Sequence, residues 1–90
     1  MLSVRKVVLY SADGCHLCER ARATVLEVQR DTPFDLAEVD ITGDAELESR
    51  YRELLPVVEI DGRRAFVYHV PEAGLRTRLA AQTTSESRGL

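Results

Sequence analysis

The chain has 90 residues, 44% of them hydrophobic and 30% charged, and a formal net charge of -3. This length suits one small domain with a single core, and the composition is that of a folded globular protein and excludes a disordered one. A mildly acidic chain repels phosphate backbones, and its arginine pairs are scattered, so we expect no nucleic-acid partner. The apolar run at residues 7–10 is far shorter than the roughly eighteen residues that a membrane span needs.

The first strand is expected at residues 4–10, where the side chains are β-branched and almost continuously apolar. Such a run is typical of a strand that is buried on both faces. Arg5 and Lys6 precede the run, but it is shorter than the apolar region of a signal peptide. We therefore expect a cytoplasmic protein with no membrane partner.

A first helix should begin near Cys15, after turn formers at residues 11–14 that include two candidate caps, Ser11 and Asp13. Its apolar stripe at helical spacing consists of Leu17, Ala21, Val25 and Val28. The helix should end at Thr32, because a residue that precedes proline disfavours the helical region.

Residues 34–41 alternate apolar and acidic side chains, which predicts an edge strand or a strand with one face in water. A second helix follows and ends before Pro56, with apolar positions at Leu47, Tyr51, Leu54 and Leu55. Asp61-Gly62 then predicts a hairpin between strands at residues 57–60 and 65–68.

Pro71 suits the first position of a last helix, on which Leu75 and Leu79 share a face. The residues that follow are polar. We therefore assign residues 1–82 to the domain and residues 83–90 to a flexible polar tail.

The elements follow the order β-α-β-α-β-β-α. A strand-helix-strand unit crosses over to a parallel neighbour, whereas the Asp61-Gly62 turn forces the last two strands antiparallel. The sequence therefore predicts an α/β domain with a mixed four-stranded sheet flanked by helices.

At this point the chain resembles the thioredoxin fold and, within it, the small glutaredoxin-like proteins, over residues 4 to about 81. The resemblance rests on the Cys15-His16-Leu17-Cys18 motif after the first strand, on Leu55-Pro56 before the third, and on a chain that opens directly on the first strand. It implies a glutaredoxin-like dithiol-disulfide oxidoreductase with a cis-proline at Pro56 beside the cysteine pair. The residues expected to meet a substrate are His16, Leu17, Leu55 and Pro56.

The chain departs from the glutaredoxin pattern at two places that concern glutathione. Ala12 stands where the family has a lysine, and residues 70–74 replace a Gly-Gly segment that holds the amino-acid end of the tripeptide. We expect no tightly bound cofactor. Glutathione and a thioredoxin-reductase-type donor are both candidate reductants, and glutathione is also a candidate substrate.

Cys15 and Cys18 are the catalytic candidates. The start of a helix presents free N–H groups and a positive dipole end, which favour the thiolate form of Cys15, so Cys15 should be the nucleophile and Cys18 the resolving thiol. Residues three apart on a helix have Cβ atoms roughly 5–6 Å apart, whereas a disulfide needs about 3.8 Å, so closing the ring requires a modest movement.

Two other functions remain open from the residues alone. Cys15 and Cys18 from two chains can together supply four sulfur ligands to a metal or an iron–sulfur cluster. The chain can also be a non-catalytic binding module of the same fold.

For the oxidoreductase we expect a monomer that acts on protein disulfides or small thiol compounds. A lone His69 at a strand end can be a metal ligand or a base, but such a histidine is more often structural. We interpret Tyr10 and Tyr68 as core or rim residues rather than catalytic ones.

Overall fold

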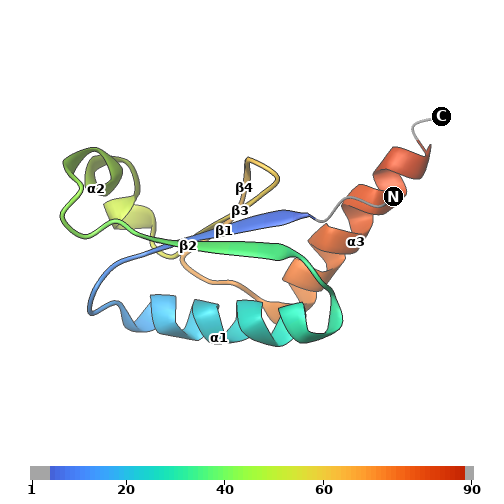
Figure 1. Cartoon of the computed structure of the whole chain (residues 1–90), viewed down its shortest axis with the longest axis horizontal. Helices are drawn as coiled ribbons and strands as arrows, with labels where there is room; N and C mark the ends of the chain where they lie inside the picture. Colours follow the sequence, from blue (N-terminus) through green and yellow to red (C-terminus); the bar gives the residue numbers. More distant parts are fainter. Residues whose placement is uncertain (1–4, 89–90) are drawn as a thin grey trace.

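The computed structural model of the chain describes residues 5–88 and shows one mixed four-stranded sheet with helices on both faces (Figure 1). The strands are β1 (Lys6–Ser11), β2 (Asp35–Asp40), β3 (Val57–Ile60) and β4 (Arg63–Val67). The helices are α1 (His16–Asp31), α2 (Ala45–Tyr51), the short 3₁₀ turn η1 (Arg52–Leu54) and α3 (Glu72–Arg88). The predicted order of elements is confirmed.

The strand order across the sheet is β2-β1-β3-β4. β1 pairs in parallel with β2 and antiparallel with β3, and β3 pairs antiparallel with β4. The first strand is therefore central and the second lies at an edge, as the apolar run and the alternating pattern predicted. Val4, the first residue assigned to that strand, lies outside the described residues.

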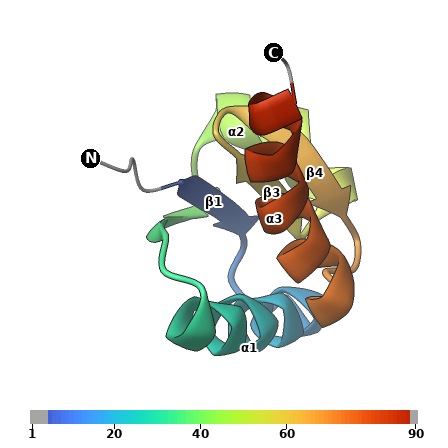
Figure 2. The same ribbon diagram turned by 90° about the vertical axis from the view of Figure 1, so that its right-hand side faces the viewer.

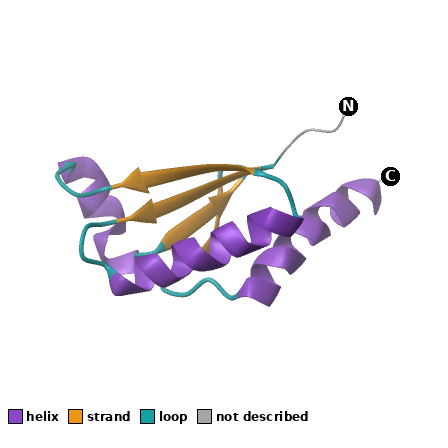
Figure 3. Cartoon of the chain, turned by 60° about the horizontal axis from the view of Figure 1, so that its bottom comes forward, coloured by secondary structure: helices purple, strands orange, loops and turns teal. Residues whose placement is uncertain are grey.

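One face of the sheet is covered by α1 and α3 and the other by α2 with η1 (Figures 2 and 3). Alternate residues of β1 point to the two faces, so Val7 and Leu9 pack under α1 and α3 while Tyr10 packs towards α2. The first core also contains Leu75 and Leu79, as the pattern of the last helix predicted.

Helix α1 is held on the sheet by Cys18, Ala21, Val25 and Val28, which are all buried. Leu17 was expected on this stripe, but its side chain is 52% exposed. That prediction was wrong because the stripe starts one residue later: Cys18 takes the core position of the first turn, and Leu17 is therefore rotated outward by one residue step.

The helix cap also differs from the prediction. Cys15 itself is the N-cap residue, in an extended conformation, and its Sγ accepts a hydrogen bond of 3.1 Å from the N–H of Cys18. Ser11 and Asp13 were the predicted caps. Ser11 ends β1, and Asp13 lies before the glycine that turns the chain into the helix, so both lie too far upstream to cap it.

The β3-β4 hairpin turns at Asp61 and Gly62, both with positive φ, as the Asp-Gly pair predicted. Helix α3 continues along the backbone to Arg88, past the predicted domain limit at residue 82, and residues 89–90 lie outside the described residues. That residues 83–90 are flexible stays a prediction. Within the described part of the chain, no helix is long and apolar enough to cross a membrane.

The hairpin turn is fastened to the start of β1 through one carboxylate. Asp61 Oδ1 accepts the backbone N–H of Lys6 at 2.9 Å, and its Oδ2 accepts from Nε of Arg5 at 2.5 Å. The Lys6 N–H, followed by the contact with Arg5, holds the pKa of Asp61 below its usual range. This junction ties the antiparallel half of the sheet to its central strand.

Asp61→Asn should lower the free energy of unfolding at pH 7 by about 1 kcal/mol, because asparagine tolerates the positive φ but loses the ionic contacts. A carboxyl whose pKa is depressed by folding stabilises the fold above its unfolded-state pKa of about 3.9, and this contribution disappears as the pH falls through the folded-state pKa. The difference between wild type and variant should therefore shrink in acid. Urea unfolding at several pH values measures it, with exposed Glu53→Gln as the control; a difference that is independent of pH would contradict the assignment.

Candidate functional site

The cysteine pair lies where β1 gives way to α1. Gly14 precedes it with a φ of +74°, a left-handed conformation that glycine adopts without steric cost and that turns the chain into the helix. Cys15 and Cys18 are joined by a disulfide with their Cα atoms 5.2 Å apart, within the usual range for such bonds. The two sulfur-bearing residues thus meet across one helical turn.

The two cysteines differ in exposure. Cys18 is 1% exposed and belongs to the buried stripe of α1, whereas Cys15 is only partly buried and reaches the surface at the helix start. The first N–H groups of a helix have no partner within the helix and carry its positive dipole end. Cys15 is therefore the accessible sulfur, in a position that favours a thiolate when the disulfide is open.

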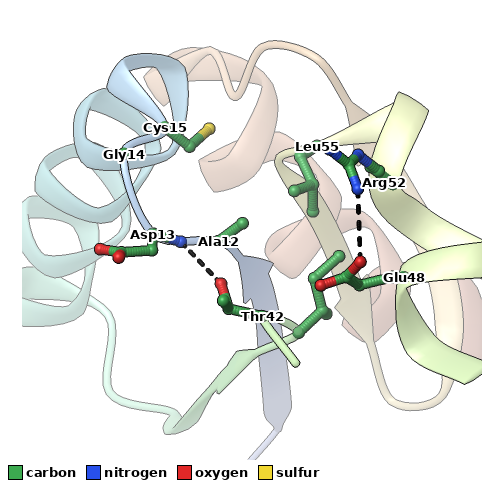
Figure 4. A pocket seen from close by; sticks show the side chains of 9 residues that line it. Ala12, Asp13, Gly14, Cys15, Thr42, Glu48, Arg52 and Leu55 are labelled. Carbon is green, nitrogen blue, oxygen red and sulfur yellow. Dashed lines mark hydrogen bonds and ion pairs between the residues drawn. The ribbon is translucent and has the colours of Figure 1, made fainter. Parts of the chain in front are cut away.

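A pocket of about 370 Å³ opens beside Cys15 on the side of α2 (Figure 4). The loop after β1 and Leu55 line it from two sides, and the sulfur of Cys15 points into the space between them. Its far wall carries Glu48 and Arg52, an ion pair at 3.3 Å in which the Arg52 side chain is 71% exposed. The pocket therefore places the sulfur of Cys15, an apolar wall and a rim cation around one space.

The loop that carries the pair is fastened to the segment after β2. The N–H of Asp13 donates to Oγ1 of Thr42 at 2.9 Å (Figure 4). The N–H of Ile41 donates to the carbonyl of Ser11 at 2.9 Å. In turn, Oδ1 of Asp40 accepts the N–H of Thr42, and this hydrogen bond lowers the pKa of Asp40. Thr42 thus positions the turn that leads into Cys15.

Leu55 and Pro56 lie opposite the cysteine pair, as the resemblance implied. Their peptide bond is cis, Pro56 is buried, and Leu55 is partly buried and lines the pocket with Cys15. The carbonyl of Pro56 accepts the N–H of Tyr68 at 3.0 Å, which links this segment to the end of β4. The structure thus brings Leu55 together with Cys15 from a distant part of the chain.

His16 and Leu17, the other two residues expected to meet a substrate, are both exposed. Leu17 lines a separate groove on the opposite side of α1's first turns, together with Tyr68 and His69. Sequence reasoning missed Thr42, Glu48 and Arg52. Nothing in the sequence pattern shows that these three side chains reach the pocket.

A second small cavity, of about 320 Å³, lies between α1 and β2 and is lined by both cysteines and by Ser11, Arg22 and Glu38. Arg22 donates to both oxygens of Glu38, and the buried Ser11 hydroxyl donates to Oε2 of Glu38 at 3.2 Å. The hydrogen bond from Arg22 is the main cause that lowers the pKa of Glu38. Glu38 is therefore ionised at neutral pH, and Arg22 compensates its charge near Cys18.

The two tyrosines behave as predicted. Tyr10 stacks on Tyr51 under α2, with ring centroids 4.2 Å apart, and burial with the neighbouring Tyr51 and Glu59 raises the pKa of Tyr10 to about 12. Tyr10 is therefore a neutral core residue at physiological pH. Tyr68 lies at the rim.

Among the described side chains, those of residues 5–80, no cluster of three or more histidine, cysteine, aspartate or glutamate residues is arranged to hold a metal ion. Cys15 and Cys18 are the two thiol ligands of the chain, so a four-sulfur site requires a second chain. The metal-binding alternative thus depends on dimerisation.

Residues 6–80 match the family model described as Glutaredoxin-like domain (DUF836). The chain belongs to this glutaredoxin-like family. A mycobacterial relative, the uncharacterized protein Rv0508 of Mycobacterium tuberculosis, is 31% identical over 87 residues, which span 91% of this chain and 90% of that protein.

Solved structures agree with this assignment. A structural genomics target protein from X. campestris is 31% identical, with a TM-score of 0.72 over 83% of this chain and 96% of that chain. Protein Ne2328 from Nitrosomonas europaea gives a TM-score of 0.72 at 26% identity, over 87% of this chain and 94% of that one. Fasciola hepatica thioredoxin, 21% identical, shares the fold with a TM-score of 0.64 over 87% and 80% of the two chains. The glutaredoxin-like chain thus has the thioredoxin fold, as the resemblance implied.

After reduction, Cys15 should react with iodoacetamide about tenfold faster than Cys18 or more, because the Cys18 side chain is buried while Cys15 is accessible at the helix start. Timed alkylation followed by peptide mapping measures the two rates in one sample. The Cys15→Ser variant should show the slow phase alone. Equal rates at the two sulfurs in the folded protein would contradict the arrangement.

Proposed function

We propose that this glutaredoxin-like protein is a thiol-disulfide oxidoreductase that uses Cys15 and Cys18 to reduce or exchange disulfides. The observation that carries the proposal is the disulfide between a partly exposed cysteine at the start of α1 and a buried one a turn later, with the exposed residue lining a pocket. The glutaredoxin-like family match and the shared thioredoxin fold support it.

The reaction starts from the dithiol form. The Cys15 thiolate attacks one sulfur of a substrate disulfide, so a Cys15–substrate disulfide forms, the substrate S–S bond breaks, and one substrate thiolate leaves and takes up a proton. The Cys18 thiolate then attacks Sγ of Cys15 and releases the second substrate thiolate. Two electrons pass to the substrate, and the protein is left with the Cys15–Cys18 disulfide.

The different positions of the two sulfurs explain this order. Cys15 is reachable from the pocket, and the free N–H groups of the helix start stabilise its thiolate both as nucleophile and as leaving group. Cys18 is shielded from bulk solvent and already directs its N–H at Sγ of Cys15, 3.1 Å away. Cys18 is thus positioned to attack the mixed disulfide from within the protein.

We further propose that Leu55 and Pro56 contact the substrate on one side of Cys15 and that His16 and Leu17 contact it on the other. The partner that returns the protein to the dithiol is a thiol donor, either glutathione or a dithiol protein of a thioredoxin-reductase-type system. A reducing cytoplasm supplies both, and this is the compartment that we propose. The protein then works as a monomer without a tightly bound cofactor.

Cys15→Ser should lower turnover of 2-hydroxyethyl disulfide to the uncatalysed background, because the attacking sulfur is gone. Cys18→Ser should still attack but should accumulate the Cys15–substrate mixed disulfide, which intact mass measures directly. Cys15→Ser should keep the melting temperature of the reduced wild type, whereas Cys18→Ser should melt lower, because it places a hydroxyl in the buried stripe of α1. Unchanged turnover in Cys15→Ser would contradict the proposed function.

A further inference from the structure

The groove lined by Leu17, Tyr68 and His69 flanks the first turns of α1 on the side away from α2. It has a volume of about 370 Å³, and its walls come from α1 and from the connection between β4 and α3, which runs alongside α1 (Figure 1). Leu17, Arg20 and Thr24 line it from the helix, and Tyr68, His69 and Val70 line it from the connection. Since Leu17 lies between the two cysteines in the chain, the groove lies next to the turn that carries them.

Two large apolar side chains are exposed at this groove. Leu17 is 52% exposed and Tyr68 is 53% exposed. The third large apolar side chain exposed among residues 5–80 is Leu26, at 44%, which lies farther along α1 and does not line the groove. Apolar surface in contact with water is thus concentrated next to the cysteine pair, as it is on surfaces that contact a partner.

Tyr68 also keeps an unfavourable backbone conformation. Its φ is +69°, in the left-handed region that disfavours a bulky side chain and that glycine adopts without cost. Asp61, the other non-glycine residue with positive φ in the described chain, is of a type that tolerates this region and lies in a tight hairpin turn.

The Tyr68 backbone is fixed by its N–H, which donates to the carbonyls of Leu54 at 3.2 Å and of Pro56 at 3.0 Å. The N–H of His69 donates to the carbonyl of Val67 at 2.7 Å. All of these are main-chain contacts, which glycine would make equally well. The backbone conformation therefore does not explain why this residue is a tyrosine. The feature that remains to explain the residue type is the ring, which lies exposed at the groove.

The charge of the groove restricts what can bind there. Apart from Tyr68, its ionisable side chains are Arg20 and His69, both basic. The pocket on the other side of Cys15 instead contains Asp13 and Glu48 with Arg52. An acidic segment of a substrate is therefore favoured in the groove and disfavoured in the pocket.

We propose that Tyr68 is a specificity-determining residue which, together with Leu17, receives an apolar side chain next to the reactive cysteine of a peptide or protein disulfide that carries an acidic flank. This inference rests on the proposed oxidoreductase function and names the substrate class of the same site. Tyr68 offers a large, rigid ring with a polar tip, which is well suited to contact a peptide at low entropic cost. Arg20 and His69 face the acidic flank.

The test compares two disulfides on the full-length protein. One is the homodimeric disulfide of a short peptide with phenylalanine before and glutamate after its cysteine, and the other is 2-hydroxyethyl disulfide, which is too small to fill the groove. The measured quantity is the ratio of kcat/KM for the peptide to kcat/KM for the small disulfide. Tyr68→Gly should lower this ratio about tenfold, the size of effect expected when one large apolar contact is removed.

Matched variants separate specificity from stability. Tyr68→Phe, which keeps the ring, should retain the ratio, and Leu26→Ala, which truncates an exposed apolar residue elsewhere on α1, should leave it at the wild-type value. Thermal unfolding should show that Tyr68→Gly melts no lower than the wild type, because glycine suits the positive φ. A loss of specificity without a loss of stability is the signature of a recognition role.

Charge gives a second, independent comparison. Replacing the peptide's glutamate by lysine should lower the rate, and the difference between the two peptides should shrink as salt is added. Arg20→Gln should reduce the same difference at low salt.

An active wild type whose ratio is unchanged in Tyr68→Gly would overturn the inference while leaving the proposed function in place. A wild type that reacts with neither disulfide would overturn both.

Discussion

The packing of Cys18 into the apolar stripe of α1 is the constraint on which the site depends. Once Cys18, Ala21 and Val25 face the sheet, the rotation of the helix is fixed, and the Gly14 turn starts the helix so that Cys15 lies at its open end. Cys15 thereby becomes the cap of the helix and the accessible sulfur of the pair. The same rotation turns Leu17 out into solvent. The burial of Cys18 and the turn at Gly14 together leave Cys15 as the more exposed sulfur.

The surroundings of the pair are different on its two sides. Towards α2, Cys15 faces a pocket with Leu55 and an ion pair between Glu48 and Arg52. On the other side, the groove next to Leu17 is apolar and basic. Both walls are brought to the pair by β3 and β4, because the segment before β3 and the segment after β4 are linked by the hydrogen bond from Tyr68 to Pro56. The antiparallel half of the sheet therefore shapes the binding surface, while the parallel half positions the sulfur atoms.

Much of this could be predicted from local patterns. The central strand, the edge strand, the Asp61-Gly62 hairpin and the cis peptide bond before Pro56 all follow from apolar periodicity, turn chemistry and a family resemblance, and the structure confirms them. The wrong predictions, namely the burial of Leu17 and the caps Ser11 and Asp13, all concern the start of α1. A stripe at helical spacing fits either Leu17 or Cys18 in the first turn, and periodicity does not decide between neighbours where the sheet ends.

Other features had no local signal. Thr42 lies in the segment after β2 and Arg52 lies in η1, and both reach the site only through tertiary packing. The left-handed conformation of Tyr68 is held by carbonyls of a segment more than ten residues away. One measurement tests the central claim most directly: equilibration of the full chain in buffers of graded reduced to oxidised glutathione, followed by acid quenching and intact mass. The account predicts a reversible conversion between the dithiol and a form lighter by two hydrogen atoms, with any glutathione adduct on Cys15. Failure to form the Cys15–Cys18 disulfide at any ratio, or stable adducts on Cys18 in the folded protein, would contradict it.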